Sequence, residues 1–120
     1  MLFPILTNLR YTKRKKSSIE KKTKGNIFFW GGSTKTLMFL CFCHQKNRLL
    51  DSIKYIVDID VTKQNHYLQI VNKKIISPKK IFKIITKKDL VVVSNSNYLS
   101  EVKKSIKENL NLNIKCISLD

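Results

Sequence analysis

Residues 66–93 read HYLQIVNKKIISPKKIFKIITKKDLVVV, and this stretch decides the fold that the sequence predicts. Two short apolar runs, 68–72 and 90–93, have the β-branched and aliphatic composition of strands. Polar breaks at 72–74 and 77–80 and a lysine-rich turn bound them. Strands this short bury little apolar surface alone. We therefore expect them to pack on helices and to direct their basic loops toward an acidic partner.

Helices are predicted on both sides of this stretch. Ser33 is a suitable N-cap for a buried helix at 34–46, and a second helix is expected at 48–57. The alternation at 114–119 favours a final strand. A third helix is predicted at 97–110, with an apolar stripe formed by Leu99, Val102, Ile106 and Leu110.

An aromatic segment at 25–32 precedes the first of these helices and is interpreted as a turn. Phe28, Phe29 and Trp30 stand in a row, and we expect that they cannot all point inward. One of them would meet a neighbouring protein or stack on unpaired bases. Contact with the core or with a protein is the favoured alternative.

Composition indicates one domain with arms, because the chain has 120 residues and a mass of 14.0 kDa. Its net charge is +16, which favours a polyanionic partner, RNA first. Heavy use of lysine, isoleucine and asparagine is typical of an AT-rich genome such as that of an organelle. Residues 10–24 are expected as a basic segment that is either a solvated tail or an arm ordered by phosphates. Residues 1–9 form an apolar tip that does not resemble a signal peptide.

Three cysteines form no disulfide framework and favour a reducing compartment. Cys41 and His44 share a helix face, but Cys43 points elsewhere and no fourth ligand accompanies Cys116. We therefore expect no metal. The apolar run 37–43 is too short to span a bilayer.

No pattern of catalytic residues is found, so the sequence predicts a protein that is not an enzyme and has no cofactor. Asp58 and Asp60 are expected as turn or cap residues, and His66 as structural. The segment 31–36, GGSTKT, lacks the spacing of a phosphate-binding loop.

Several motifs resemble a known family when they are taken in order. They are Val71-Asn72-Lys73-Lys74, Ser77-Pro78, the run from Lys87 to Val93, and Arg48-Leu49-Leu50-Asp51 upstream. In this order they resemble the S-four RNA-binding domain, and the following helix is similar to that of the small-subunit ribosomal protein S-four family. Lys73 stands where that family has glycine, so Asn72 is expected to take the positive φ instead.

The resemblance implies an α+β fold in which a small S-four-like β unit packs on two or three helices. Residues 1–32 would form the basic arm and aromatic turn, and 33–120 the RNA-binding domain with its C-terminal helix and strand. The implied role is a structural constituent of the small ribosomal subunit of an organelle, mitochondrial or alternatively a plastid. Ribosomal RNA and neighbouring ribosomal proteins would be the partners, with no membrane and no small-molecule substrate.

The basic side chains are interpreted as a phosphate clamp. Those expected to contact RNA are Arg10, Lys13, Arg14, Lys15, Lys16, Lys21, Lys22, Arg48, Lys54, Lys73, Lys74, Lys79, Lys80, Lys87 and Lys88. Two alternatives stay open: a free-standing RNA-binding or RNA-modifying accessory protein, and a cationic membrane-surface protein.

Overall fold

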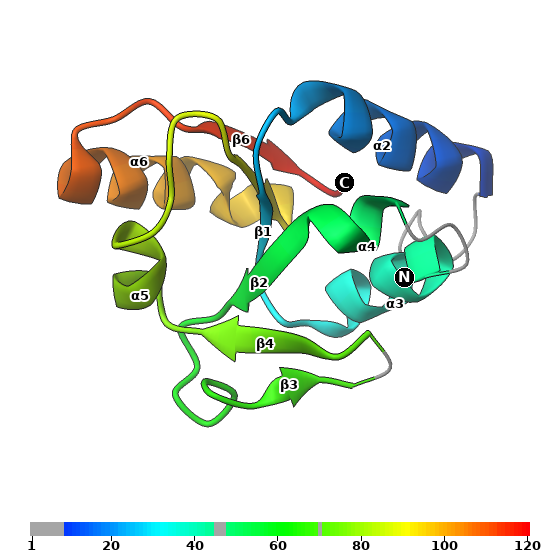
Figure 1. The fold of residues 1–120 in the computed structure, drawn as a ribbon, viewed down its shortest axis with the longest axis horizontal. Helices are drawn as coiled ribbons and strands as arrows, with labels where there is room; N and C mark the ends of the chain where they lie inside the picture. Colours follow the sequence, from blue (N-terminus) through cyan, green and yellow to red (C-terminus); the bar gives the residue numbers. More distant parts are fainter. Residues whose placement is uncertain (1–8, 45–47, 70) are drawn as a thin grey trace.

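The computed structural model of the chain describes residues 9–44, 48–69 and 71–120. Figure 1 shows that helices and strands alternate along the chain and form one fold, which confirms the predicted class in its coarse form. The elements are α2 (Leu9–Lys22), β1 (Ile27–Trp30), α3 (Thr34–His44), α4 (Arg48–Ser52), β2 (Ile53–Val57), β3 (Tyr67–Leu68), β4 (Lys73–Ile76), α5 (Pro78–Phe82), β5 (Leu90–Val93), the 3-10 helix η1 (Ser96–Tyr98), α6 (Leu99–Leu110) and β6 (Lys115–Ser118).

The strands form one sheet in the order β3-β4-β2-β1-β5-β6. All neighbouring pairs are parallel except β3 and β4, which are antiparallel. The chain begins the sheet at its centre, extends it to one side through β2 and β4, and then returns to add β5 and β6 on the other side. This order is that of a doubly wound α/β fold. The small β unit predicted at 66–93 is therefore divided, because β2 and β1 lie between β4 and β5.

β1 runs through the middle of the sheet, and all four of its side chains are buried. Ile27 and Phe29 pack in a hydrophobic cluster on one face, and Phe28 and Trp30 pack in a second cluster on the other face. The prediction that the three aromatics cannot all be buried is wrong. Successive side chains of a strand point to opposite faces, and here both faces are covered.

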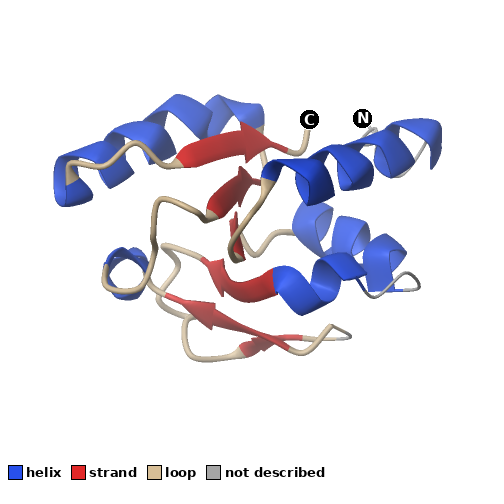
Figure 2. Ribbon diagram, turned by 45° about the horizontal axis from the view of Figure 1, so that its top comes forward, coloured by secondary structure: helices blue, strands red, loops and turns tan. Residues whose placement is uncertain are grey.

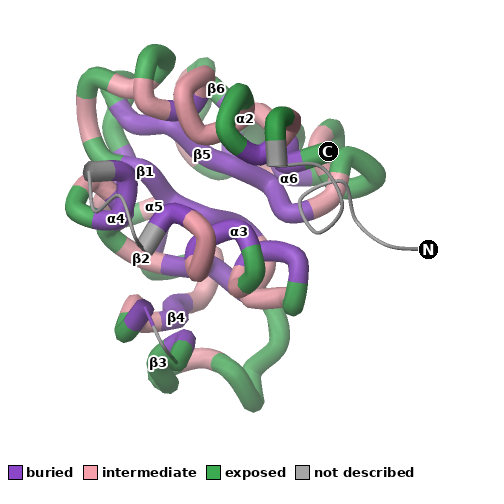
Figure 3. Tube along the Cα trace, turned by 90° about the vertical axis from the view of Figure 1, so that its right-hand side faces the viewer, coloured by how far each residue is buried: buried purple, intermediate pink, exposed green. Residues whose placement is uncertain are grey.

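Helices cover the two faces unequally. Figure 2 shows α2, α3 and α4 on one side of the sheet and α5 and α6 on the other. Phe39 and Leu40 of α3 pack in the first cluster, and Val102 and Ile106 of α6 pack in the second. Figure 3 shows that buried residues follow β1 and β5. The result is a three-layer α/β/α arrangement.

The basic segment at 10–24 is a helix for most of its length and not an extended arm. Ile19 of α2 is fully buried in the first cluster, and the Tyr11 hydroxyl donates a hydrogen bond to the Leu119 carbonyl. One apolar face is therefore enough to dock this lysine-rich helix on the sheet. β1 lies before the predicted boundary at residue 32, and the other strands lie after it. The expected arm and the expected domain therefore share one sheet.

The helix predicted at 48–57 is corrected by the structure, because α4 ends at Ser52 and residues 53–57 are β2. Ile53, Ile56 and Val57 are β-branched and buried, and they pair with β1 and β4. β-Branched side chains favour a strand when the sheet gives them neighbours on both faces.

The strand predicted at 68–72 is corrected as well. Tyr67–Leu68 forms a two-residue strand and Lys73–Ile76 forms β4, with a turn between them. Ile70 lies outside the described residues. Asn72 has a φ of 55°, the positive value expected for it, and it occupies that turn.

The C-terminal half follows the predictions closely. Strands are found at Leu90–Val93 and Lys115–Ser118, and η1 and α6 occupy the helix predicted at 97–110. The helix predicted at 34–46 is described as Thr34–His44, and residues 45–46 and the apolar tip at 1–8 lie outside the described residues. In the described ranges we find no helix with the length and apolar character needed to cross a membrane.

Candidate functional site

The site lies where the direction of strand addition reverses, between the carboxyl ends of β1 and β5. In open α/β sheets this position leaves a crevice, because the two chain connections depart to opposite sides. A cavity of about 380 Å³ is found there. Its lining is Trp30, Gly31, Gly32, Ser33, Asp58, Ile59, Lys63, Pro78, Val93, Ser94, Tyr98, Glu101, Val102 and Ser105.

Gly31 allows the chain to turn at the end of β1. Its φ is +112°, a value that side chains with a Cβ rarely adopt, and its amide donates a hydrogen bond of 2.6 Å to the Val57 carbonyl. A Cβ at this position would collide with the Ser94 hydroxyl. The turns after β1 and β5 can therefore meet at this point only because residue 31 is glycine.

Asp58 connects the turns after β1 and β2. One carboxylate oxygen accepts a hydrogen bond of 2.8 Å from the Gly32 amide, and the other accepts one of 2.9 Å from the Asp60 amide. The prediction that Asp58 and Asp60 are turn residues is confirmed, since Asp60 in turn accepts a hydrogen bond from the Thr62 amide. Asp58 is also buried, so its carboxylate holds one wall of the crevice in place.

Lys63 brings a positive charge to the same wall. Its Nζ lies 3.9 Å from a carboxylate oxygen of Asp58 and 3.4 Å from the Gly32 carbonyl oxygen. The side chain is 44% exposed, so it stays accessible to a bound molecule.

The floor of the crevice lies at Ser33, just before the first turn of α3. Ser33 Oγ accepts a long hydrogen bond of 3.5 Å from the Thr36 amide, which agrees with its predicted role as N-cap. The Thr36 hydroxyl donates a hydrogen bond of 2.6 Å to the Gly31 carbonyl, so the turn and the helix are fastened together. The first amides of a helix have no partner inside it and carry partial positive charge. This floor therefore favours oxygen atoms and negative charge.

The opposite wall comes from η1 and α6. Tyr98 and Glu101 are exposed at its rim, whereas Val102 is buried behind them. Asp120 supports the start of this wall by accepting a hydrogen bond of 2.7 Å from the Ser96 amide and one of 3.0 Å from Lys35 Nζ. The crevice thus combines hydroxyl groups, carboxylates, one ammonium group and apolar surface, which suits a small polar molecule.

The structure does not bring the predicted RNA-binding residues into one cluster. Lys79 and Lys80 follow β4 at the carboxyl edge of the parallel strands, whereas Lys87 and Lys88 precede β5 at the amino edge. Lys73 and Lys74 open β4, and both are half-buried. The six loop lysines predicted as one clamp therefore divide between two edges.

The remaining predicted residues lie elsewhere. Arg48 begins α4, and Lys54 is exposed on β2. Those on α2 are Arg10, Lys13, Arg14, Lys15, Lys16, Lys21 and Lys22. Of the predicted residues whose side chains the structure describes, none lines the crevice at the switch point.

The residues that do form the crevice were not predicted as a site. The spacing of 31–36 excludes a phosphate-binding loop, and local pattern indicates only an N-cap at Ser33 and a turn or cap residue at Asp58. A usable signal was present, since paired glycines follow a buried strand and an aspartate ends the next one. That signal depends on recognising β1 and β2 as strands.

Possible metal ligands were sought among the His, Cys, Asp and Glu side chains that the structure describes. No group of three or more of these described side chains is placed to hold an ion. Cys43 and Cys116 are buried on opposite faces of the sheet.

A comparison with known families finds one match over nearly the whole chain. A family described as the C-methyltransferase C-terminal domain matches residues 9–119. No curated protein matches the chain. The family match overturns the resemblance to the S-four RNA-binding domain, and with it the predicted role in the small ribosomal subunit. It also corrects the predictions of a non-enzyme, of ribosomal partners and of no small-molecule substrate, because a methyltransferase domain indicates an enzyme, and the methyl donor of such an enzyme is a small molecule.

Proposed function

The chain belongs to the C-methyltransferase C-terminal domain family, and on this premise we propose that its switch-point crevice binds the molecule that receives the methyl group. The observation that carries the proposal is the position of the crevice. It lies at the carboxyl ends of β1 and β5, where doubly wound folds bind their ligands.

The methyl donor fits this crevice poorly. S-Adenosylmethionine supplies an electrophilic methyl group on a positively charged sulfur, and it carries an adenosine. In nucleotide-binding folds of this order, an acid at the end of the second strand binds the ribose hydroxyls. Asp58 holds that position here, but each of its oxygens already accepts an amide hydrogen bond and the residue is only 9% exposed, which leaves little of it for a ribose. We therefore assign the crevice to the acceptor and not to the donor.

The chemistry of C-methylation narrows the class of acceptor. The acceptor carbon loses a proton to a base and forms a bond to the methyl group, while the bond from that methyl group to the donor sulfur breaks. A carbon beside a carbonyl group loses a proton most readily. Negative charge then develops on the carbonyl oxygen, and positively charged donors stabilise it. Lys63 is such a donor at the crevice, and Ser33 places the start of α3, with its partial positive charge, beside it. An acceptor that carries a carbonyl group and an anionic group suits them.

The other wall suits hydroxyl groups of the same molecule. Glu101 can accept hydrogen bonds, and the Ser94 and Ser105 hydroxyls can both donate and accept them. Tyr98 offers an aromatic face at the rim. We expect these residues to bind and orient a hydroxylated ketone or a related sugar-like compound.

The proposal is tested by following the backbone amide signals of the chain in NMR. Fructose 6-phosphate is the probe, because it is a hydroxyketone with an anionic group. It is expected to shift the amides of Gly31, Gly32 and Ser33. Glu101→Gln should weaken its binding by roughly two- to tenfold, the value of one hydrogen bond.

Glu108→Gln is the matched control, since Glu108 lies on the same helix outside the crevice. The Glu108→Gln variant should bind fructose 6-phosphate as tightly as the wild type does. The assignment to the acceptor is refuted if S-adenosylhomocysteine, the donor product, shifts these three amides and fructose 6-phosphate does not.

A mitochondrial location, with another organelle such as a plastid as the alternative, is kept as a proposal. It rests on the lysine-, isoleucine- and asparagine-rich composition. A fluorescent fusion of the chain in its host tests it, since fluorescence outside the organelles would contradict it.

A further inference from the structure

A second surface lies at the amino edge of the sheet, away from the crevice. We propose that this surface, named the basic edge, binds the phosphate backbone of a nucleic acid. Each of its side chains is an exposed lysine. They are Lys21, Lys22, Lys24, Lys87, Lys88 and Lys115.

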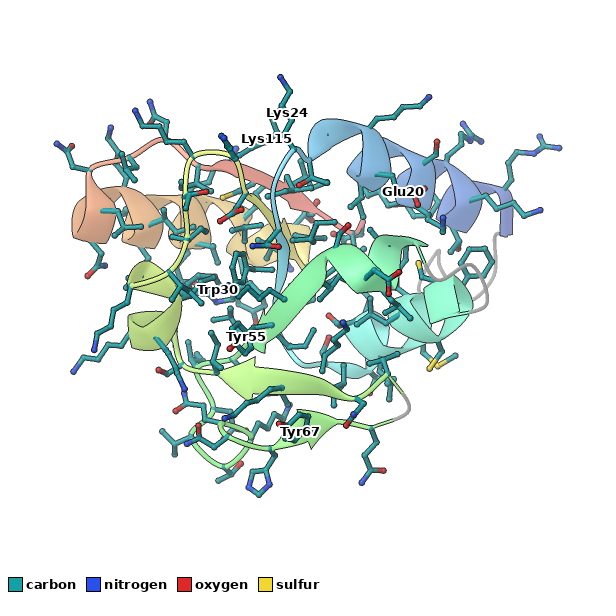
Figure 4. The ribbon with its side chains drawn as sticks, in the orientation of Figure 1. Glu20, Lys24, Trp30, Tyr55, Tyr67 and Lys115 are labelled. Atoms are coloured by element: carbon teal, nitrogen blue, oxygen red, sulfur yellow. The ribbon has the colours of Figure 1, made fainter. Side chains whose placement is uncertain are left out.

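Parallel pairing brings these lysines together from distant parts of the sequence. Leu90 of β5 lies between Ile27 of β1 and Lys115 of β6 in the register of the sheet. Neighbouring strands are about 4.8 Å apart, so the segments that enter β1, β5 and β6 share one edge. Figure 4 labels Lys24 and Lys115 at this end of the molecule.

Gly25 shows how closely the entries to β1 and β5 approach. A Cβ at residue 25 would lie 3.0 Å from the Lys88 carbonyl oxygen. The segments that carry Lys24 and Lys88 therefore approach each other closely, and both exposed lysines belong to the same edge.

The charge of this edge is not neutralised within the described part of the chain. Asp89 lies beneath it but is 4% exposed, and its oxygens accept hydrogen bonds of 2.8 Å from the amides of Asn26 and Thr86. Glu20 pairs with Lys16 at 2.9 Å. Exposed like charges held this close repel one another, and a row of phosphates relieves that repulsion.

The side chains favour a nucleic acid over a membrane surface. A membrane-bound basic surface also needs exposed apolar side chains that enter the lipid. The large exposed apolar residues of the described chain are Met38, Ile59, Val61, Tyr67 and Tyr98, and none belongs to the segments that enter β1, β5 and β6. Because lysine is a point charge without a planar fork, we expect contacts to phosphates without reading of the base sequence.

This inference does not depend on the function proposed for the crevice, because the two surfaces occupy opposite edges of the parallel strands. It refines the predicted RNA-binding set. Lys21, Lys22, Lys87 and Lys88 are retained, and Lys24 and Lys115 are added.

The test compares two triple variants that remove the same charge. The first changes three lysines of the basic edge, Lys24→Gln, Lys88→Gln and Lys115→Gln. The control changes three exposed lysines on or beside α5, Lys79→Gln, Lys80→Gln and Lys83→Gln. Binding to a fluorescent 20-nucleotide RNA and to duplex DNA is measured by anisotropy over a range of salt concentrations.

The edge variant should lose at least about tenfold in affinity, and its log–log salt slope should fall by roughly 2, at about 0.7–0.9 per lost phosphate contact. The control variant should keep most of the affinity and most of the salt slope of the wild type. Lys→Arg changes at the three edge positions keep the charge and should retain binding. Melting curves check that all variants are folded.

If the two triple variants lost affinity equally, net charge alone would explain the binding, and the proposal would be overturned. It is also overturned if the wild-type chain binds vesicles of anionic lipid through these lysines but binds neither nucleic acid. The tighter of the two affinities, for RNA or for duplex DNA, identifies the nucleic acid that supplies the phosphates.

Discussion

Gly31 and Ser94 meet at the carboxyl ends of the two central strands, so closely that the Ser94 hydroxyl occupies the space of a Cβ at residue 31. The same glycine has a φ of +112° and donates a hydrogen bond to the Val57 carbonyl. One residue thus joins the turns after β1, β2 and β5. The shape of the crevice depends on it.

Gly31→Ala is therefore expected to destabilise the chain and to weaken binding in the crevice. The unfavourable φ alone costs about 1–3 kcal/mol, and the collision with Ser94 adds to it. Chemical denaturation measures the loss. Gly31→Ala combined with Ser94→Gly removes the collision but not the strain, so its stability should lie between those of the wild type and the single variant. A single variant as stable as the wild type would contradict the role of Gly31.

The second prediction concerns the docking of α2. Ile19 is fully buried, so Ile19→Ala should lower the free energy of unfolding by about 2–5 kcal/mol. Lys13→Ala, at an exposed position of the same helix, should stay within about 0.5 kcal/mol of the wild type. Urea unfolding compares the two variants. If α2 were a solvated arm, the two changes would have equally small effects.

The third prediction is a pH dependence at Asp120. Burial acts to raise the pKa of this carboxyl, but hydrogen bonds from Lys35 and from the Ser96 amide outweigh it and lower the pKa below the ordinary value of 3.8. A carboxyl with a lowered pKa stabilises the fold above its ordinary value. This contribution is lost as the pH falls through the lowered pKa of the folded chain.

Asp120→Asn removes this contribution. Its melting temperature should lie below that of the wild type near neutral pH, and the two should converge as the pH falls below 3.8. Glu108→Gln, at an exposed position of α6, is the control and should follow the wild type. A difference between wild type and Asp120→Asn that persists at low pH would show that charge is not its cause.

The fourth prediction concerns thiol reactivity. Burial raises the pKa of Cys43 to about 12 and that of Cys116 to about 11, so neither forms much of the reactive thiolate at pH 8. Cys41 is only half-buried and should react first with a thiol reagent in the folded chain. Cys41→Ser should abolish the fast phase, whereas all three cysteines should react in the urea-unfolded wild type. Rapid labelling of Cys43 in the folded chain would refute its burial.

Local pattern was enough to predict the elements whose side chains have a regular period. The helix after Tyr98 has its apolar stripe at Val102 and Ile106, and both are buried. Asn111 ends that helix in the left-handed conformation, as its place after the stripe suggests. The strand at Leu90–Val93 is a short β-branched run between turns.

The central strand could not be predicted in this way. A strand covered on both faces is apolar at every position, so Phe28, Phe29 and Trp30 show no alternation. The strand Ile53–Val57 could not be predicted either, because the spacing of its apolar residues also fits a helix. Without these two strands the doubly wound order cannot be recognised, and the motifs that resemble the S-four domain lie on β4 and β5, which β2 and β1 separate in the sheet.

The sequence by itself determined the charge of the chain, the C-terminal helix and strands, and the turn residues Asp58 and Asp60. Only the tertiary structure decided that β1 is central, that α2 docks on the sheet through Ile19, and that Gly31 and Asp58 form one site. The physical reason is that helix periodicity and turn chemistry are local. The burial of a strand and the meeting of two turns depend instead on pairing between segments far apart in the chain.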